Sequence, residues 1–197
     1  MTRLIVGIGG TTRPESTSEL AVRAALRAVE DRGAETLHLG GAFLARLPLY
    51  APESTARTVE QQTLVEAVRR ADGLVIGTPG YHGGISGLVK NALDLLEDLR
   101  DDTRVYVDGR AVGLVVTAAG AQACGTTLAA LRAVVHALRG WPTPLGVTLG
   151  TGGSRRLFGP DGACADARTA AQLDLLGQQV TSFADALSRT VTTSRMP

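Results

Sequence analysis

Residues 73–94 read "GLVIGTPGYHGGISGLVKNALD" and combine a short apolar run, a glycine-rich loop and the start of a helix. The run "GLVIGT" (73–78) is typical of a strand that is buried on both faces of a parallel sheet. Glycine loses more backbone freedom on folding than any other residue, so a loop rich in it is costly to order. We therefore interpret the loop as a place where a ligand comes close to the backbone.

The same alternation of strand and helix runs through the rest of the chain. Strands are expected at 3–8, 35–39, 73–78, 110–118 and 144–149, and helices at 17–31, 58–70, 86–99, 124–139 and 166–189. Strands separated by helices of this length form right-handed parallel units. The pattern predicts an α/β fold with a doubly wound, five-stranded parallel sheet and helices on both faces. We expect one domain over residues 1–197, with residues 190–197 as a frayed tail.

Composition and charge exclude some classes of function. With 44% hydrophobic residues, 20% charged residues and a net charge of +1, the chain has the composition of a soluble globular protein. It has no basic block, so no nucleic-acid partner is expected. No apolar run is long enough to cross a membrane and the start does not resemble a signal peptide, so we expect a cytoplasmic protein without a membrane partner.

Cysteine and histidine spacing does not predict a metal site. Cys124 and Cys164 lie far apart, and the three histidines are scattered, so no ligand pattern is present. We expect two thiols without a chemical role.

Ligands of doubly wound sheets bind beyond the carboxyl ends of the strands, which singles out residues 9–18, 78–87 and 117–124. The first of these segments, continued as "GGTTRPESTSEL" (9–20), offers hydroxyl groups and Arg13 just before a helix. Helix N-termini bind anions, so one interpretation is a phosphate site. The other is that Ser16 or Ser18 only caps the helix, with Glu19 in its first turn.

Two common nucleotide sites are excluded by the positions of glycine and lysine. A nucleotide triphosphatase would need GxxxxGK[ST], but the only lysine is Lys90. A dinucleotide-binding Rossmann fold would show GxGxxG and an acidic residue at the end of its second strand, whereas that strand ends in His38-Leu39-Gly40. A phosphate site in the first loop would therefore serve a mononucleotide.

Two motifs resemble the signatures of the NADPH-dependent FMN reductase family. "GTTRPESTS" (10–18) is similar to the family's phosphate loop, approximately GSxRxxSxS, and "TPGYHGGISGLVKNALD" (78–94) is similar to its flavin loop, approximately TPEYNGSIPGxLKNALD. The second motif is the more specific one. The resemblance extends over residues 3 to 187 and implies a flavodoxin-like fold with strand order 2-1-3-4-5.

The resemblance also implies FMN as the cofactor and NADPH or NADH as the electron donor. The phosphate would lie on the first loop, the isoalloxazine ring on the second, and the third loop, "TAAGAQ" (117–122), would close the other edge of the ring. The cofactor-binding residues expected on this basis are Thr11, Arg13, Ser16, Thr17, Ser18, Pro79, Gly80, Tyr81, His82, Gly83, Thr117, Ala118, Ala119 and Gly120. No catalytic side chain and no metal is expected, because the hydride chemistry belongs to the cofactor.

The flavin loop departs from the family pattern at four positions. Gly80 replaces a common glutamate, His82 an asparagine, Gly84 a serine and Ser86 a proline. We interpret Gly80 and Gly84 as leaving room above the ring, and we leave open whether His82 contacts the flavin or only solvent. Lys90 and Asp94 are spaced to pair along the following helix.

Several functions remain open at this point. The main expectation is an NAD(P)H-dependent FMN reductase, which could supply reduced FMN to a flavin-dependent monooxygenase. The alternatives are an enzyme that keeps FMN bound and reduces quinones, azo dyes or metal oxyanions, and a flavodoxin-type electron carrier. Carriers of that type are strongly acidic, whereas this chain has a pI near 7.9. The resemblance further implies a homodimer or homotetramer that assembles through helices 86–99 and 124–139.

Overall fold

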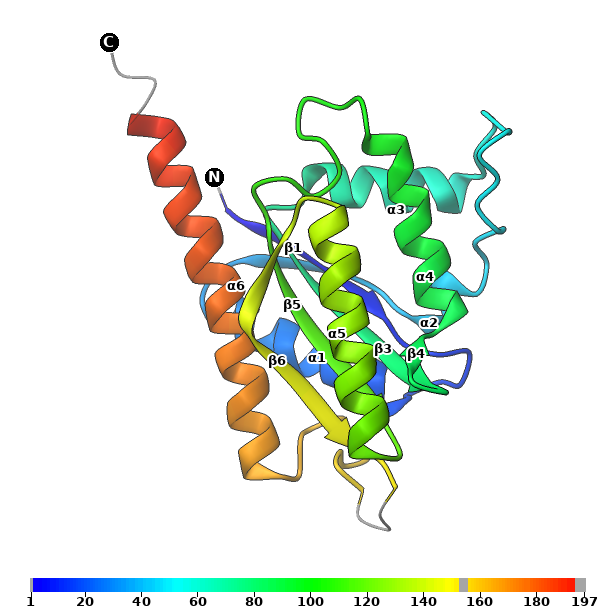
Figure 1. The fold of residues 1–197 in the computed structure, drawn as a ribbon. Coiled ribbons are helices and arrows are strands. Elements are labelled where there is room, and N and C mark those ends of the chain that lie inside the picture. Colours follow the sequence, from blue (N-terminus) through cyan, green and yellow to red (C-terminus); the bar gives the residue numbers. More distant parts are fainter. Residues whose placement is uncertain (1, 153–155, 194–197) are drawn as a thin grey trace.

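In a computed structural model, which describes residues 2–152 and 156–193, five parallel strands form the central sheet (Figure 1). Their order is β2-β1-β3-β5-β6. The strands are β1 (Leu4–Gly9), β2 (Glu35–Leu39), β3 (Gly73–Tyr81), β5 (Ala111–Ala118) and β6 (Trp141–Gly150). A short strand, β4 (Gly84–Ile85), pairs only with β3 and runs antiparallel to it. With β4 set aside, this is the predicted order 2-1-3-4-5.

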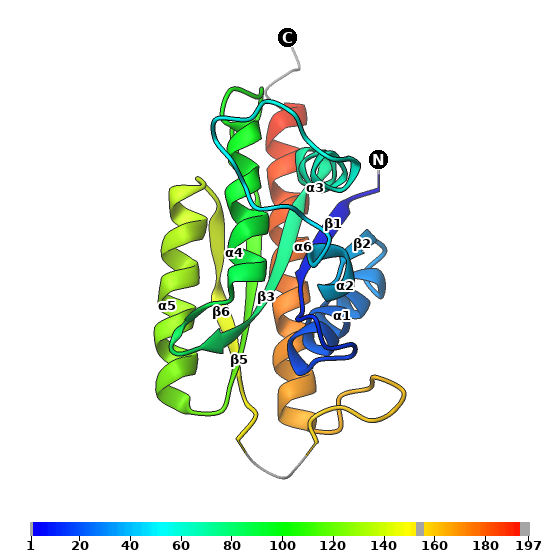
Figure 2. The same ribbon diagram turned by 90° about the vertical axis from the view of Figure 1, so that its right-hand side faces the viewer.

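Helices cover both faces of the sheet, as Figure 2 shows. One face carries α1 (Thr17–Glu30) and α6 (Ala167–Thr193). The other carries α3 (Val59–Arg70), α4 (Gly87–Asp94) with the 3-10 turn Leu95–Leu99, and α5 (Ala121–Ala137). Neighbouring residues of a strand point to opposite faces, so Ile5 and Val6 enter different cores and both are fully buried. This two-sided burial explains the continuous apolar runs of the strands.

Some element boundaries differ from the predicted ones. β6 begins at Trp141 rather than at 144, although Pro142 and Pro144 lie within it. Among the described strands it pairs only with β5, and an edge strand tolerates prolines because one side of its backbone makes no ladder bonds. α5 begins at Ala121, directly after the third loop, instead of at 124.

The ends of the predicted helices 86–99 and 166–189 also differ from the structure. The predicted helix 86–99 is α-helical only to Asp94 and then tightens into the 3-10 turn. α6 continues to Thr193, so residues 190–193 belong to it and are not a frayed tail, while residues 194–197 lie outside the described part. The four-residue helix α2 (Gly41–Leu44) was not predicted.

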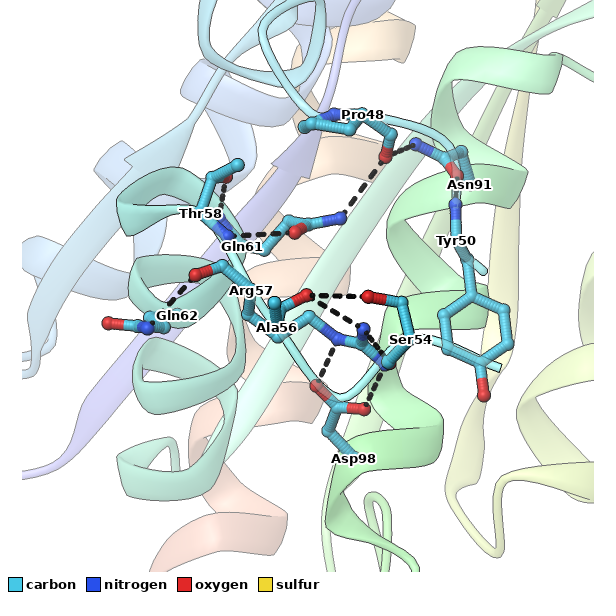
Figure 3. Close-up of polar contacts among 10 residues, drawn as sticks. All are labelled: Pro48, Tyr50, Ser54, Ala56, Arg57, Thr58, Gln61, Gln62, Asn91 and Asp98. Atoms are coloured by element: carbon cyan, nitrogen blue, oxygen red, sulfur yellow. Dashed lines mark hydrogen bonds and ion pairs between the residues drawn. The ribbon is translucent and has the colours of Figure 1, made fainter. Parts of the chain in front are cut away.

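The irregular segment between α2 and α3 is held by a polar network (Figure 3). Asn91 of α4 accepts a hydrogen bond from the Tyr50 N–H at 2.8 Å and donates to the Pro48 carbonyl at 3.0 Å. Arg57 makes two hydrogen bonds, of 2.8 and 2.9 Å, to the Asp98 carboxylate. The segment is thus tied to α4 and to the 3-10 turn, the two elements that follow the glycine-rich residues 78–86.

Two further expectations concern the membrane and the cysteines. Within the described residues, no helix has both the length and the apolarity required to span a membrane. Cys124 is buried, Cys164 is half-buried, and both are free thiols. The Cys124 thiol lies 3.7 Å from the Leu149 carbonyl oxygen, inside the packing of α5 against β6.

Candidate functional site

A cavity of about 320 Å³ lies at the carboxyl edge of the sheet, where the loops after β1, β3 and β5 meet. All of the predicted site residues except Gly83 and Gly120 line it. The lining residues are Thr11, Arg13, Ser16, Thr17, Ser18, Pro79, Gly80, Tyr81, His82, Thr117, Ala118, Ala119 and Thr151. Three segments that are far apart in the sequence therefore form one site, as the parallel topology requires.

The loop after β1 presents hydroxyl groups and one guanidinium. The Thr11 hydroxyl accepts a hydrogen bond from the Arg13 N–H at 3.1 Å, which closes a tight turn. The Ser16 hydroxyl caps α1 by accepting from the Glu19 N–H at 3.4 Å, and it lies 3.3 Å from the Ser18 hydroxyl. The capping interpretation of Ser16 is thus confirmed, and Ser16, Thr17 and Ser18 at this helix start also line the cavity. The Arg13 side chain is exposed and has no hydrogen-bond or ion-pair partner within residues 2–152 and 156–193.

A charged pair with one buried member, Glu19, lies next to this loop. The Glu19 carboxylate is almost completely buried and accepts a 2.8 Å bond from Arg23. Burial lowers the pKa of the neighbouring His38, while the charge of Glu19 raises it in part. His38 is the residue before the last one of β2, and its imidazole packs beside the loop as a largely neutral group. Glu19, Arg23 and His38 support the loop after β1 and do not line the cavity.

The glycine-rich loop predicted after the third strand is a β-hairpin formed by β3 and β4. Gly80 pairs with Ile85 and Tyr81 with Gly84, so β3 runs three residues past the predicted end. His82 and Gly83 form the turn, with φ of 52° and 80°. Two-residue hairpin turns with both φ positive favour Asn-Gly, which explains the asparagine of the family pattern and the glycine at position 83. His82 adopts the same backbone conformation at a cost that asparagine would reduce.

The turn itself is anchored on α5. The Gly83 carbonyl accepts a 3.1 Å bond from the Thr126 hydroxyl, which places Gly83 behind the cavity instead of on its wall. The Tyr81 side chain is 58% exposed at the cavity mouth. The hairpin therefore offers an exposed aromatic ring and a rigid backbone edge to any ligand.

Gly80 serves packing against α5, not clearance above a ring, so that interpretation was wrong. A Cβ on Gly80 would lie 2.8 Å from the Thr127 hydroxyl oxygen and 3.2 Å from the Ala123 carbonyl oxygen. A Cβ on Gly84 would meet nothing closer than 3.8 Å. Of these two glycines, only Gly84 has open space where a Cβ would lie.

Ser86 has a local role that replaces the family's proline. Its hydroxyl caps α4 by accepting from the Val89 N–H at 3.3 Å, and its own N–H donates to the Thr78 hydroxyl at 3.1 Å. Thr78 and Ser86 thereby close the base of the hairpin. This pairing fixes the hairpin on the start of α4.

The third loop is shorter than predicted. The reason is that α5 begins at Ala121, so Gly120 is its N-cap and lies outside the cavity lining. Thr117 and Ala118 belong to β5, as the predicted strand 110–118 implied. Thr151, which follows β6, lines the cavity and was missed. Its N–H donates to the Ala118 carbonyl at 2.8 Å, so it is a fixed neighbour of the third loop. Its position directly after a strand is the signal that could have identified it.

The motif residues on α4, after the hairpin, make structural contacts and do not line the cavity. Lys90 and Asp94 form the predicted pair along α4, with the ammonium 2.5 Å from the carboxylate. Both side chains are still partly open to solvent, at 45% and 40% exposure, so the pair contributes little to stability. Asn91, buried at the same helix, holds the segment around Pro48 as described above.

The site as a whole has two chemically different ends. Hydroxyls, backbone N–H groups and Arg13 converge at the end of β1, which suits a phosphate. The hairpin, Pro79 and the alanines of the third loop form the other end, which suits a flat ring.

A comparison with models of protein families shows to which family the chain is related. The family model of the NADPH-dependent FMN reductases matches residues 3–153, which include all three loops of the cavity. The chain belongs to this family. Residues of both motifs that predicted it line the same cavity.

Sequence relatives of this FMN reductase family member match part of it. An iron-sulfur flavoprotein, MJ1083, of Methanocaldococcus jannaschii is 30% identical over 49% of this chain and 53% of that protein. An FMN-dependent NADPH-azoreductase of Staphylococcus haemolyticus is 40% identical over 40% of this chain and 38% of that protein. The chain thus spans about half or less of the length of the curated relatives it matches.

Solved structures share the fold over nearly the whole chain. FerB, an NAD(P)H:(acceptor) oxidoreductase of Paracoccus denitrificans, superimposes with a TM-score of 0.73 over 95% of this chain and 98% of its own, at 19% identity. The apo form of an NADH:FMN oxidoreductase, EmoB, gives a TM-score of 0.69 over 94% and 90%, at 22% identity. A flavodoxin-like WrbA-like protein from Agrobacterium tumefaciens gives 0.63. At these identities the likeness establishes the flavodoxin-like fold alone.

Proposed function

We propose that the protein binds FMN in this cavity and reduces it with NADPH or NADH. The observation that carries the proposal is the meeting of the phosphate-type loop and the flavin-type hairpin on two walls of one cavity. Family membership supports FMN as the ligand. Part of the same proposal is that the enzyme works in the cytoplasm.

The residues present fit FMN. Arg13 with the hydroxyls of Thr11, Ser16, Thr17 and Ser18 would hold the phosphate by charge-assisted and neutral hydrogen bonds. The buried position of Ser16 and Ser18 keeps these hydroxyls in place before a ligand arrives.

At the other end of the cavity, Pro79, Gly80, Tyr81 and His82 would support the ring, with Thr117, Ala118, Ala119 and Thr151 along its other edge. When bound, FMN supplies a ring that accepts a hydride from a nicotinamide and passes electrons on. We assign this chain's residues to binding and orientation only. Tyr81, exposed at the mouth, limits how substrates approach the ring.

The electron acceptor is a small molecule in this proposal. The staphylococcal relative is named an azoreductase, which favours an enzyme that keeps FMN bound and reduces azo compounds or quinones. The alternative is release of reduced FMN to a monooxygenase. Turnover that saturates with an azo dye at one FMN per chain would support the first, and turnover only with excess free FMN the second.

A homodimer completes the proposal. The outward face of α5 carries small residues at every fourth position, Gly125, Ala129, Ala133 and Ala137, and all of them are exposed. Such a face allows a second helix to approach closely, and it adjoins the hairpin through Thr126. A monomer in sedimentation equilibrium at micromolar concentrations would contradict this part of the proposal.

Substitution of Arg13 tests the phosphate site. Arg13→Ala is expected to weaken FMN affinity by about tenfold or more, because one charge-assisted hydrogen bond is lost. The measurement is quenching of FMN fluorescence on titration with protein. Arg70→Ala removes an exposed arginine at the end of α3, at the opposite edge of the sheet, and serves as the matched control. Equal FMN affinity of Arg13→Ala and the unmodified protein would reject the assignment.

A further inference from the structure

A second hollow, of about 570 Å³, adjoins the FMN cavity. Arg13, Thr17 and Thr151 line both, so the two spaces lie side by side. The outer wall is formed by residues 156–160, which follow β6 and precede α6. A ligand that covers the FMN cavity can therefore extend into this hollow.

The outer wall of the hollow is held in a defined conformation. Phe158 is buried in the core next to α1, and its backbone forms an isolated antiparallel β-bridge with Cys164. The Gly159 N–H donates to the Ala163 carbonyl at 2.9 Å. Arg27 of α1 donates a 2.7 Å bond to the Gly162 carbonyl. Arg156 therefore directly precedes a segment that is held by internal hydrogen bonds and by a hydrogen bond from α1.

The hollow carries uncompensated positive charge. Most arginines of the described chain have a carboxylate partner or a carbonyl acceptor, such as Arg23 with Glu19 and Arg57 with Asp98. Arg13 and Arg156, in contrast, form no side-chain hydrogen bond or ion pair with any residue in 2–152 or 156–193. Glu15 is the one acidic group among the described lining residues.

The position of the hollow fits the phosphates of a nicotinamide dinucleotide. A nicotinamide stacked on a ring at the hairpin end is joined to its pyrophosphate through a ribose, much as the flavin ring is joined to its own phosphate through a ribityl chain. A dinucleotide lying along FMN therefore brings its phosphates beside the first loop, where a further anion needs cations other than those used by FMN. Planar guanidinium groups bind phosphate with two parallel hydrogen bonds, which makes arginine suited to this task.

We propose that this hollow binds a phosphate group in the adenosine half of NADPH, with Arg156 as the residue that binds this phosphate. The proposal rests on the proposed function, since it concerns the electron donor of that site. Two phosphates are chemically able to occupy it: the 2′-phosphate that distinguishes NADPH from NADH, and the pyrophosphate that both share.

The test measures direct binding as well as turnover. Adenosine 2′,5′-bisphosphate and ADP are titrated by calorimetry into the FMN-loaded protein and into Arg156→Ala, and KM and kcat are determined with NADPH and NADH. Arg13 is left unchanged because it belongs to the FMN site. We expect Arg156→Ala to weaken binding and raise KM about tenfold or more, with kcat and FMN affinity unchanged and with partial recovery in Arg156→Lys.

The two probes separate the two phosphates. Weaker binding of the bisphosphate alone, with a raised KM for NADPH only, assigns the hollow to the 2′-phosphate. Weaker binding of both probes, with both KM values raised, assigns it to the pyrophosphate. Unchanged affinity for both probes in Arg156→Ala, or an equal loss in the control Arg70→Ala, would overturn the proposal. Since FMN affinity and flavin reduction are measured separately, such a result leaves the proposed function standing.

Discussion

Replacement of Arg110 by methionine is expected to lower the free energy of unfolding by about 3–5 kcal/mol. Arg110 is fully buried, and its guanidinium donates hydrogen bonds of 2.8–2.9 Å to the carbonyls of Arg69, Ala71 and Tyr106. Burial lowers its pKa to about 10, so it remains charged at neutral pH. Methionine fills much of the volume but leaves three buried or partly buried carbonyls without this donor. The loss of their hydrogen bonds outweighs the relief of the buried charge.

Urea unfolding followed by circular dichroism measures this effect. Arg104→Met is the matched control, because Arg104 is only half-buried and donates a single 3.2 Å bond to the same Ala71 carbonyl. We expect a loss of about 1 kcal/mol or less for the control, and an intermediate loss for Arg110→Lys. A change below about 1 kcal/mol in Arg110→Met would show that the three carbonyls find other donors.

Gly80→Ala is expected to cost about 1–3 kcal/mol and to weaken FMN affinity about tenfold or more. Gly80 has no positive φ, so the requirement for glycine is steric. The new methyl group would lie 2.8 Å from the Thr127 hydroxyl oxygen and push the hairpin away from α5. Because Tyr81 and His82 lie on that hairpin, the displacement would reach the FMN cavity.

A double-mutant cycle with Thr127→Ala tests this cause. The Thr127 hydroxyl is buried and has no hydrogen-bond partner in the described chain, so its removal alone is expected to cost about 1 kcal/mol or less. Gly80→Ala combined with Thr127→Ala should recover about half of the lost stability or more. Gly84→Ala, in the same hairpin but in open space, is the control and should stay within about 0.5 kcal/mol of the unmodified protein. Additive effects of the Gly80 and Thr127 changes would disprove the contact.

Most of the fold could be predicted because its signals are local. Continuous apolar runs such as "GLVIGT" and amphipathic helices between them determine the order of the elements, and parallel topology then follows from general rules. The exceptions depend on tertiary neighbours. The prolines of β6 are tolerated only because it lies at the sheet edge, and the β3–β4 hairpin depends on pairing that periodicity does not reveal.

The residues that line the cavity were largely predictable because the motifs and the strand ends indicate the same loops. What the sequence left ambiguous was the direction in which each residue points. Gly80 looked like clearance for a ligand, yet its missing side chain faces α5. Gly83 and Gly120 lie within the right loops but outside the cavity, and Thr151 enters it from a loop with no motif. These outcomes are decided by helix–loop packing, which a residue pattern does not encode.

The central claim is that the protein binds FMN in the cavity and reduces it with a nicotinamide nucleotide. The most direct measurement is stopped-flow mixing of the FMN-loaded protein with NADPH, and then NADH, under anaerobic conditions. We predict rapid loss of the flavin absorbance at about 450 nm, faster than for free FMN at the same concentrations. Bound FMN that stays oxidised with both nucleotides would contradict the claim and favour an electron carrier.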